Sequence, residues 1–161
     1  MKAPLNDKDI AIIEVIQRNG DLSHAEIGRQ VGLSVSAVHD RVRRLVANAV
    51  IRGWSALVSP AALDLNLLAF VYVLIDRTEH IRGFLDGIER HGEVMECHHL
   101  AGDWNYLLKV RVSTTAELEN FISKGLKSYP GVTRTATTIV LSPVKETHAL
   151  STKHLLQRSP A

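Results

Sequence analysis

The sequence is short of the residues that mark secreted and membrane-embedded proteins. Among its 161 residues there is a single cysteine, Cys97, so no internal disulfide bond can form. The longest apolar stretch without a charge, Leu65 to Ile75, is too short to cross a bilayer, because a spanning helix needs about 20 apolar residues. The first twenty residues carry charges throughout and lack the apolar centre of a secretory signal. We therefore expect a soluble, cytoplasmic protein.

Aromatic residues are also scarce, at 5%, yet 45% of the residues are hydrophobic and 22% are charged, with a mean hydropathy of +0.02. A chain of this composition can bury a core, which excludes a wholly disordered protein. Its mass of 17.8 kDa suits one ordinary domain or two small ones that share a junction.

The small net charge of +2 hides a basic segment. Between Arg29 and Arg52 there are five arginines and one acidic residue, Asp40, which is a local excess of four positive charges. Such a focused excess in a near-neutral chain indicates contact with a polyanion. A solvated helix face is the plainer explanation, so charge alone does not decide between the two.

Three short helices are expected in the first fifty residues, and each has a capping residue at its start. Asn6, Ser23 and Ser34 each precede a run with helical spacing, and each can accept a hydrogen bond from the first turn. Gly20 and Gly32 stand where the first and second helices should end. An apolar pair brackets each cap as a hydrophobic staple, and these pairs are Leu5 with Ile10, Leu22 with Ile27, and Leu33 with Val38.

The third helix has the features of a DNA-recognition helix. It follows a short glycine-containing turn, Val31 to Ser34, as in a helix-turn-helix unit. Its apolar face is expected to contain Val35, Val38, Val42, Leu45 and Val46. On the opposite face, small residues near the helix start allow close approach to base edges, and arginines further along can reach guanine edges or phosphates. A protein-interaction module is the alternative for such a trihelical unit.

We predict that this helix binds double-stranded DNA sequence-specifically. The residues expected nearest the bases are Ser36, Ala37, Asp40, Arg41 and Arg44. The residues expected to touch backbone phosphates are Ser34, His39 and Arg43.

The expected secondary structure changes after the basic segment, from helices alone to strands and helices. Residues 1–52 form the predicted helix-turn-helix domain, residues 53–62 a linking strand and hinge, and residues 63–161 a second domain with a C-terminal tail. The second domain reads as strand, helix, strand, strand, helix, strand, which predicts an α+β, ferredoxin-like fold with both helices on one face of an antiparallel sheet. The expected strands are Leu67–Ile75, Val94–Leu100, Tyr106–Val112 and Val132–Leu141.

The first of these strands, Leu67 to Ile75, shows no polar alternation. A strand with helices on one face and water on the other should alternate, so both faces are expected to be buried. Because only two helices are available, the simplest cover for the second face is another copy of the sheet. The sequence thus predicts a homo-oligomer, at least a dimer, built on residues 63–161.

Motifs in two distant parts of the chain carry a family resemblance. The first part holds Leu5-Asn6-x-x-Asp9, then Leu33-Ser34-x-Ser36-Ala37-Val38-x-x-Arg41-Val42, then Val50-Ile51-x-Gly53. The second holds Gly102-Asp103-Trp104-Asn105-Tyr106-Leu107-Leu108, followed by Pro130-Gly131-Val132. Together they resemble the leucine-responsive and asparagine-regulator (Lrp/AsnC) family. The resemblance implies a transcription regulator that pairs a DNA-binding domain with a ferredoxin-like domain, which senses amino acids and builds dimers, commonly assembled into octamers.

The resemblance also implies an effector site at the turn between the second and third strands. The residues expected to form it are Ala101, Gly102, Asp103 and Asn105, with Thr135 and Thr137 of the last strand as a second wall. A glycine there lets a ligand approach the backbone, although a plain Gly-Asp turn is the alternative. Asn105 stands where the family has aspartate, so recognition of an ammonium group is expected to be weak or altered, and the absence of an amino-acid effector is the alternative. Asp64 stands where the family usually has glycine, so the turn into the first strand is expected to differ.

An enzyme is the competing function class, because sirohaem decarboxylases are similar in their two-domain architecture. No Ser/His/Asp arrangement, phosphate-binding loop or pair of catalytic carboxylates stands out, so no catalytic activity is expected. The run Cys97-His98-His99 does not favour a metal site, because adjacent strand residues point to opposite faces and two ligands are too few for structural zinc. No metal or other cofactor is therefore expected.

Overall fold

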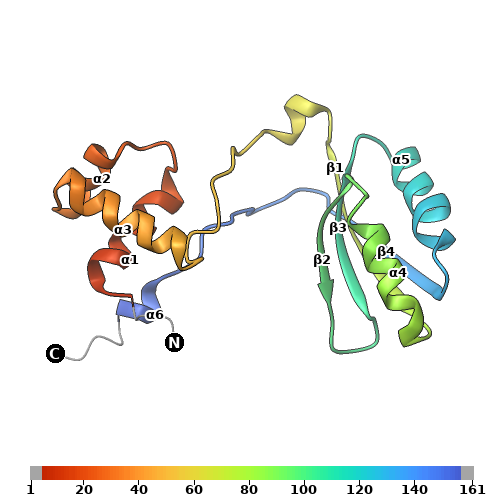
Figure 1. Ribbon diagram of the computed structural model, residues 1–161. Coiled ribbons are helices and arrows are strands. Elements are labelled where there is room, and N and C mark those ends of the chain that lie inside the picture. The colour runs from red at the N-terminus through yellow and green to blue at the C-terminus, as the bar shows by residue number, and fades with distance from the viewer. Residues whose placement is uncertain (1–4, 157–161) are drawn as a thin grey trace. The chain divides into compact units, whose positions relative to one another are not determined.

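The chain passes twice between two separately packed units in the structure, a computed structural model that describes residues 5–156 (Figure 1). Residues 5–56 and 145–156 belong to the first unit, and residues 57–144 form the second. Each unit has its own hydrophobic core. Within the described residues, no helix is both long and apolar enough to cross a membrane.

The predicted caps begin the three N-terminal helices, which are α1 (Asp7–Arg18), α2 (His24–Val31) and α3 (Val35–Ala47). The side chains of Asn6, Ser23 and Ser34 accept hydrogen bonds from first-turn backbone N–H groups at 3.0, 3.3 and 3.2 Å. Glu26 completes a capping box, and donation from the Ser23 hydroxyl and backbone N–H holds the pKa of Glu26 below its usual value. Gly32 ends α2 in the left-handed conformation, with φ 67°.

Helix α3 contributes only one face to the core of this unit. Val38, Val42 and Leu45 are buried, as predicted, and they pack with Ile12, Val15, Ile27 and Val31 of the other two helices. The prediction was wrong for Val35 and Val46, which are 54% and 41% exposed. Both lie at the edge of the apolar stripe, where neither α1 nor α2 covers them.

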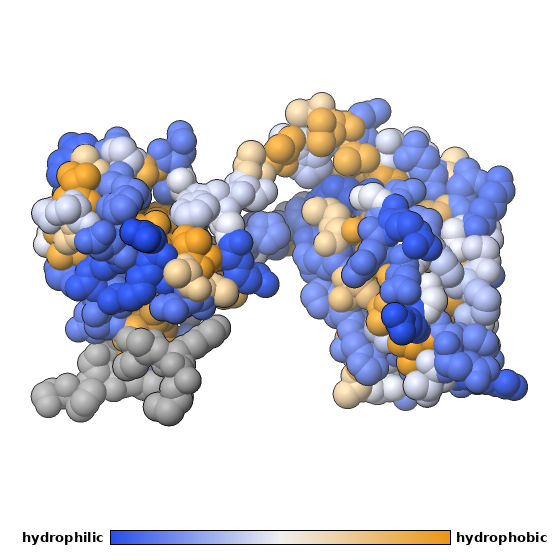
Figure 2. All heavy atoms as spheres, viewed as in Figure 1, coloured by the Kyte–Doolittle hydropathy of each residue, from blue (hydrophilic) through white to orange (hydrophobic). Residues whose placement is uncertain are grey.

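The linking strand expected within residues 53–62 is absent. Residues 50–59 form no strand, and a 3-10 helix, η1 (Pro60–Leu63), follows them. The prediction was wrong because extended backbone becomes a strand only when a neighbouring strand supplies hydrogen bonds, and the described strands pair only with one another. Figure 2 shows hydrophobic side chains along this crossing, where Leu57 and Val58 are exposed.

Asp64 turns the chain from η1 into the first strand. Its backbone adopts φ 58° and ψ 21°, a left-handed conformation that favours glycine. Aspartate is among the few other residues that adopt this conformation readily. Its carboxylate also accepts a hydrogen bond from the Asn66 side-chain amide at 3.1 Å. The aspartate therefore fits a turn at which a glycine would be expected.

The second unit has the predicted ferredoxin-like order of elements. Its strands are β1 (Leu67–Ile75), β2 (Val94–His99), β3 (Tyr106–Val112) and β4 (Val132–Ile139). They form one antiparallel sheet in the order β2-β3-β1-β4, so β1 is a central strand. One face is covered by α4 (Thr78–Ile88) and by α5 (Thr115–Asn120), which continues through a π-helical turn, η2 (Phe121–Gly125), and a 3-10 turn, η3 (Leu126–Ser128).

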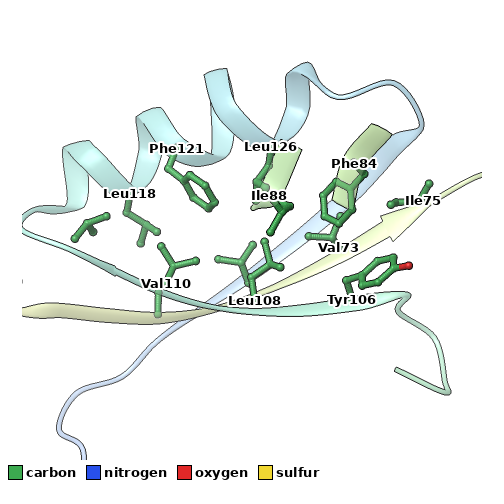
Figure 3. Packing of buried hydrophobic residues seen from close by; sticks show 13 residues of the cluster. Val73, Ile75, Phe84, Ile88, Tyr106, Leu108, Val110, Leu118, Phe121 and Leu126 are labelled. Atoms are coloured by element: carbon green, nitrogen blue, oxygen red, sulfur yellow. The ribbon is translucent and has the colours of Figure 1, made fainter. Parts of the chain in front are cut away.

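Alternate residues of the central strands face these helices. Val71 and Val73 of β1 lie opposite Leu108 and Tyr106 of β3, and all four are buried. The helix residues that point toward the strands in Figure 3 are Phe84, Ile88, Leu118, Phe121 and Leu126. This interdigitation of two layers is the core of the unit.

Neither helix of this unit covers the other face of the sheet. There, Phe70, Tyr72 and Leu74 of β1 are half-buried, and they lie beside Leu107 of β3 and Arg134 of β4. Of the β1 residues on this open face, only Leu68 is buried, so the expectation that both faces of β1 are buried is met within one chain along the helix side and at Leu68. The open face is apolar at its centre.

The C-terminal tail packs with the three-helix unit, although the sequence placed it with the sheet domain. The Gln17 side-chain amide of α1 donates to the Leu150 carbonyl at 3.1 Å and accepts from the Leu150 N–H at 2.6 Å. The buried Thr152 hydroxyl donates to the Glu14 carboxylate. The described chain ends in a short helix, α6 (Lys153–Leu156). The Gln17 side chain thus satisfies both backbone groups of Leu150, which lies outside any strand or helix.

Replacing Ser34 by alanine should lower the free energy of unfolding by about 1 kcal/mol, since its hydroxyl accepts from an otherwise free N–H group of α3. Ser59→Ala is the matched control, because Ser59 precedes η1 without a side-chain capping hydrogen bond, and its effect should stay within about 0.5 kcal/mol. Urea denaturation followed by circular dichroism measures both losses. Equal losses would contradict the capping role of Ser34.

Candidate functional site

Four exposed residues of α3 form one stripe opposite its buried face, and these are Ser36, Asp40, Arg43 and Ala47. Their spacing by four, three and four residues puts them on one side of a helix. His39 borders the stripe with its Nδ1 atom 3.3 Å from an oxygen of Asp40. The Ser34 hydroxyl lies 3.1 Å from that of Ser36 at the start of the helix. Short polar residues followed by a basic one are suited to contact a DNA groove.

Two arginines that the sequence placed near the bases are directed toward α1 instead. The Arg41 Nη1 atom lies 2.8 Å from Asp9 Oδ1 and also donates to the Asn6 side-chain oxygen at 3.1 Å. The Arg44 Nη2 atom lies 2.7 and 2.8 Å from the two oxygens of Asp9. Ala37, which is partly buried, precedes Arg41 by one helical turn. The eight predicted DNA-binding residues therefore do not form a single surface.

The partners of these arginines, Asn6 and Asp9, were not identified from the sequence. Both carry ordinary helix-start signals, because Asn6 caps α1 and Asp9 completes its capping box. The motif Leu5-Asn6-x-x-Asp9 contains them, but capping alone is sufficient to explain it. Nothing in the local pattern shows that Asp9 is 2% exposed and lies against another helix.

The predicted effector turn joins β2 to β3 and is held to β1 by Asn105. The side-chain oxygen of Asn105 accepts from the Ile75 backbone N–H at 2.6 Å. Its backbone N–H donates to the Val73 carbonyl at 3.1 Å, and its own carbonyl accepts from the Leu100 N–H at 2.8 Å. The oxygen that was expected to meet an effector's ammonium group is thus engaged by the sheet. An amide performs this role as well as a carboxylate, since only an acceptor is needed.

Gly102 lies at the open end of the same turn. Its φ of 153° is one that other residues rarely adopt, and, apart from Gly102 and its two neighbours in the chain, no described residue has an atom within 4 Å of the place that a Cβ would occupy. The backbone of this turn, which also includes Ala101 and Asp103, is exposed. A ligand can therefore approach the main chain here.

An aromatic and cationic cluster lies beside the turn on the open face of the sheet. The Trp104 ring lies 5.7 Å from the Tyr72 ring, and the Arg134 guanidinium lies 4.7 Å from the centre of the Trp104 ring. Thr135 and Thr137, the predicted second wall, lie opposite Val73 and Val71 and so share the helix-covered face. The two threonines therefore lie on the opposite face of the sheet from the aromatic and cationic cluster. No local pattern predicts the cluster of Tyr72, Trp104 and Arg134, because β4 pairs with β1 across a long connection.

The run around Cys97 divides between the two faces of the sheet. Cys97 and His99 lie opposite Leu108 and Tyr106 on the helix side, and burial raises the pKa of the Cys97 thiol. On the other side, a hydrogen bond with His98, together with Lys109, holds the pKa of Glu96 below its usual value. Among residues 5–156 no group of three or more His, Cys, Asp or Glu side chains is placed to hold a metal ion.

Two family descriptions match consecutive parts of the chain. A winged helix-turn-helix DNA-binding domain matches residues 5–52, and the Lrp/AsnC ligand binding domain matches residues 68–150. The first match contains α1 to α3, and the second contains the sheet except for Leu67, the first residue of β1.

Regulatory proteins from other organisms are also similar to this chain over nearly its whole length. The chain is 38% identical over 147 residues to the leucine-responsive regulatory protein of Haemophilus influenzae, covering 90% of this chain and 89% of that protein. A transcriptional regulator of Neisseria meningitidis, NMB0573, solved as an L-Met complex, matches with a TM-score of 0.91 and 32% identity over 94% of this chain and 99% of that one. Escherichia coli AsnC shares the fold, with a TM-score of 0.84 at 22% identity over 91% of this chain and 99% of that one. With both halves of the chain matched in order, the protein belongs to the Lrp/AsnC family of DNA-binding transcription regulators.

Proposed function

We propose that this regulator binds duplex DNA as a dimer through the outward stripe of α3, and that an amino acid modulates the binding. Ser36 and Asp40 contact base edges, and Ser34, His39 and Arg43 contact backbone phosphates. The observation that carries the proposal is the stripe itself, which is exposed, holds short polar side chains and one arginine, Arg43, and lies on the second helix of a helix-turn-helix unit.

The chemistry of the stripe supports this division of roles. The Asp40 carboxylate can accept from a cytosine amino group, which is a contact that distinguishes base pairs in the major groove. Arg43 is exposed, and no hydrogen bond or ion pair is seen for it within the described chain, so its charge is available to a phosphate. Arg41 and Arg44 differ in this respect, because Asp9 holds both.

The turn around Gly102 is the proposed effector site. Its exposed backbone amides suit a carboxylate, and the Arg134 charge beside it supports the same ligand group. Trp104 and Tyr72 offer apolar surface to a side chain. The similar Neisseria meningitidis regulator was solved with L-Met, which supports an amino acid as the ligand class.

The open face of the sheet is the proposed dimer surface. Phe70, Tyr72, Leu74 and Leu107 place apolar side chains there without cover from α4 or α5. A second copy of the same face covers it most simply, because two-fold pairing buries equal surfaces on both chains.

Asp40→Ala should relax discrimination at one base pair of the binding site by about 1–3 kcal/mol, because a base-edge acceptor is lost. Affinity for unrelated duplex should not fall, since a negative charge is removed. Fluorescence anisotropy with the region upstream of the protein's own coding sequence and its point variants measures both, with Asp21→Ala as an exposed acidic control. If folded wild-type protein binds none of these duplexes at low salt, with and without amino acids, the proposed function is wrong.

A thermal-shift screen against the twenty amino acids should find at least one that raises the melting temperature, because a ligand that binds the folded state stabilises it. Gly102→Val should abolish the shift, since a branched side chain fills the approach and strains a φ of 153°. Gly92→Ala is the control, because Gly92 has open space around it and an ordinary φ. A shift that persists in Gly102→Val would place the site elsewhere.

Light scattering at micromolar concentration should give the mass of a dimer or of an even-numbered assembly of dimers. Phe70→Glu should reduce the mass toward that of a single chain, because a charge would enter the apolar contact. Lys124→Glu, an exposed change on the helix side, should leave the mass unchanged. A monomeric wild-type protein would contradict the proposed dimer.

A further inference from the structure

Asp9 is a buried carboxylate whose oxygens are surrounded by donors from two helices. It is 2% exposed and lies in the first turn of α1. Its Oδ2 accepts from the Asn6 backbone N–H at 3.3 Å and from Arg44 at 2.8 Å. Its Oδ1 accepts from Arg41 at 2.8 Å and from Arg44 at 2.7 Å. A charge so far from water is stable only when it is paired and hydrogen-bonded in this way.

The two arginines approach Asp9 from the same side of α3. They are three residues apart in sequence, so both side chains project from one flank of the helix. Arg41 spans two acceptors, since one of its nitrogens lies within 3.1 Å of both Asn6 Oδ1 and Asp9 Oδ1. Its side chain is 27% exposed, whereas that of Arg44 is 50% exposed. Arg41 is thus the more buried of the two arginines, and it contacts both Asn6 and Asp9.

This arrangement restrains α3 in a direction that its apolar contacts do not. Val38, Val42 and Leu45 hold the helix against the core, but apolar contacts are not directional and allow small rotations and slides. Hydrogen-bonded ion pairs are directional, and here they join one flank of α3 to the start of α1. Any rotation of α3 about its axis would lengthen these bonds and would turn the outward stripe by the same angle.

We infer that Asp9 and Arg41 are positioning residues for DNA recognition, which fix the angle at which α3 presents Ser36, Asp40 and Arg43, and that Arg41 does not contact DNA itself. The inference rests on the proposed function, because it takes the outward stripe of α3 as the surface that contacts DNA. It reverses the role that the charge pattern alone assigned to Arg41. It also assigns Arg41 a different role from that of Arg43, which lies two positions further along the same helix and contacts DNA.

Salt dependence distinguishes the two roles. Each phosphate contact adds about 0.9 to the slope of log affinity against log salt concentration, through the release of counterions. The slope is measured with an unrelated duplex, and the specificity ratio is the affinity for the upstream region divided by the affinity for that duplex. The variants are Arg41→Gln and Asp9→Asn, with Arg43→Gln as the matched arginine on the outward stripe.

Arg41→Gln should leave the slope unchanged and lower the specificity ratio roughly tenfold, the size of a typical coupling between contacting residues. Asp9→Asn should lower the ratio similarly without lowering the affinity for unrelated duplex. In the double variant the second change should add less than about twofold, because both changes break the same link. Arg43→Gln should instead lower the slope by about 0.9.

Circular dichroism shows whether each variant is folded, and Arg41→Lys replaces Arg41→Gln where the latter is not. A lysine keeps the charge but has no planar fork to span Asn6 and Asp9, so the ratio should still fall at an unchanged slope. The inference is overturned if Arg41→Gln lowers the slope as Arg43→Gln does, or if folded Arg41 and Asp9 variants keep the wild-type ratio. A wild-type chain that binds no DNA would overturn the proposed function and this inference together, whereas the other two results leave the proposed function standing.

Discussion

A carboxylate removed from water must be surrounded by hydrogen-bond donors. Asp9 of the N-terminal unit is such a carboxylate, and its donors come from two different helices. These donors are the Asn6 backbone at the start of α1 and two arginines of α3. The basic segment therefore has two roles. Arg41 and Arg44 pair with the buried Asp9, whereas Arg43 is exposed on the surface. Counting positive charges along the sequence overstates what the helix can offer to DNA.

The second unit depends on a comparable use of a partly buried polar side chain, that of Asn105. The Asn105 oxygen accepts the Ile75 N–H at the end of β1, the central strand of the sheet. The turn that presents Gly102 is consequently anchored to the strand whose open face carries Tyr72 and Leu74. A ligand at this turn and a partner at this face would share one strand, so that the two binding events have a direct physical connection.

Local signals in the sequence were sufficient for most of the fold. The caps Asn6, Ser23 and Ser34 and the apolar runs of β1 and β3 define elements whose bounds depend on neighbouring residues only. The expected linking strand failed because a strand requires a partner that no local pattern supplies. The site was predictable only in part for the same reason. Whether an arginine of α3 faces outward or toward Asp9 is decided by the packing of a helix more than thirty residues away.

The tail that returns to α1 has a consequence for how the protein is made. Gln17 and Leu150, which hydrogen-bond to each other, are separated by 133 positions, so the sheet lies between them in the order of synthesis. Domains generally fold as the ribosome delivers them, N-terminal part first. The helix-turn-helix unit here emerges early but acquires its last segment only after β4 has left the ribosome. The part of the protein that is synthesised first is therefore completed last.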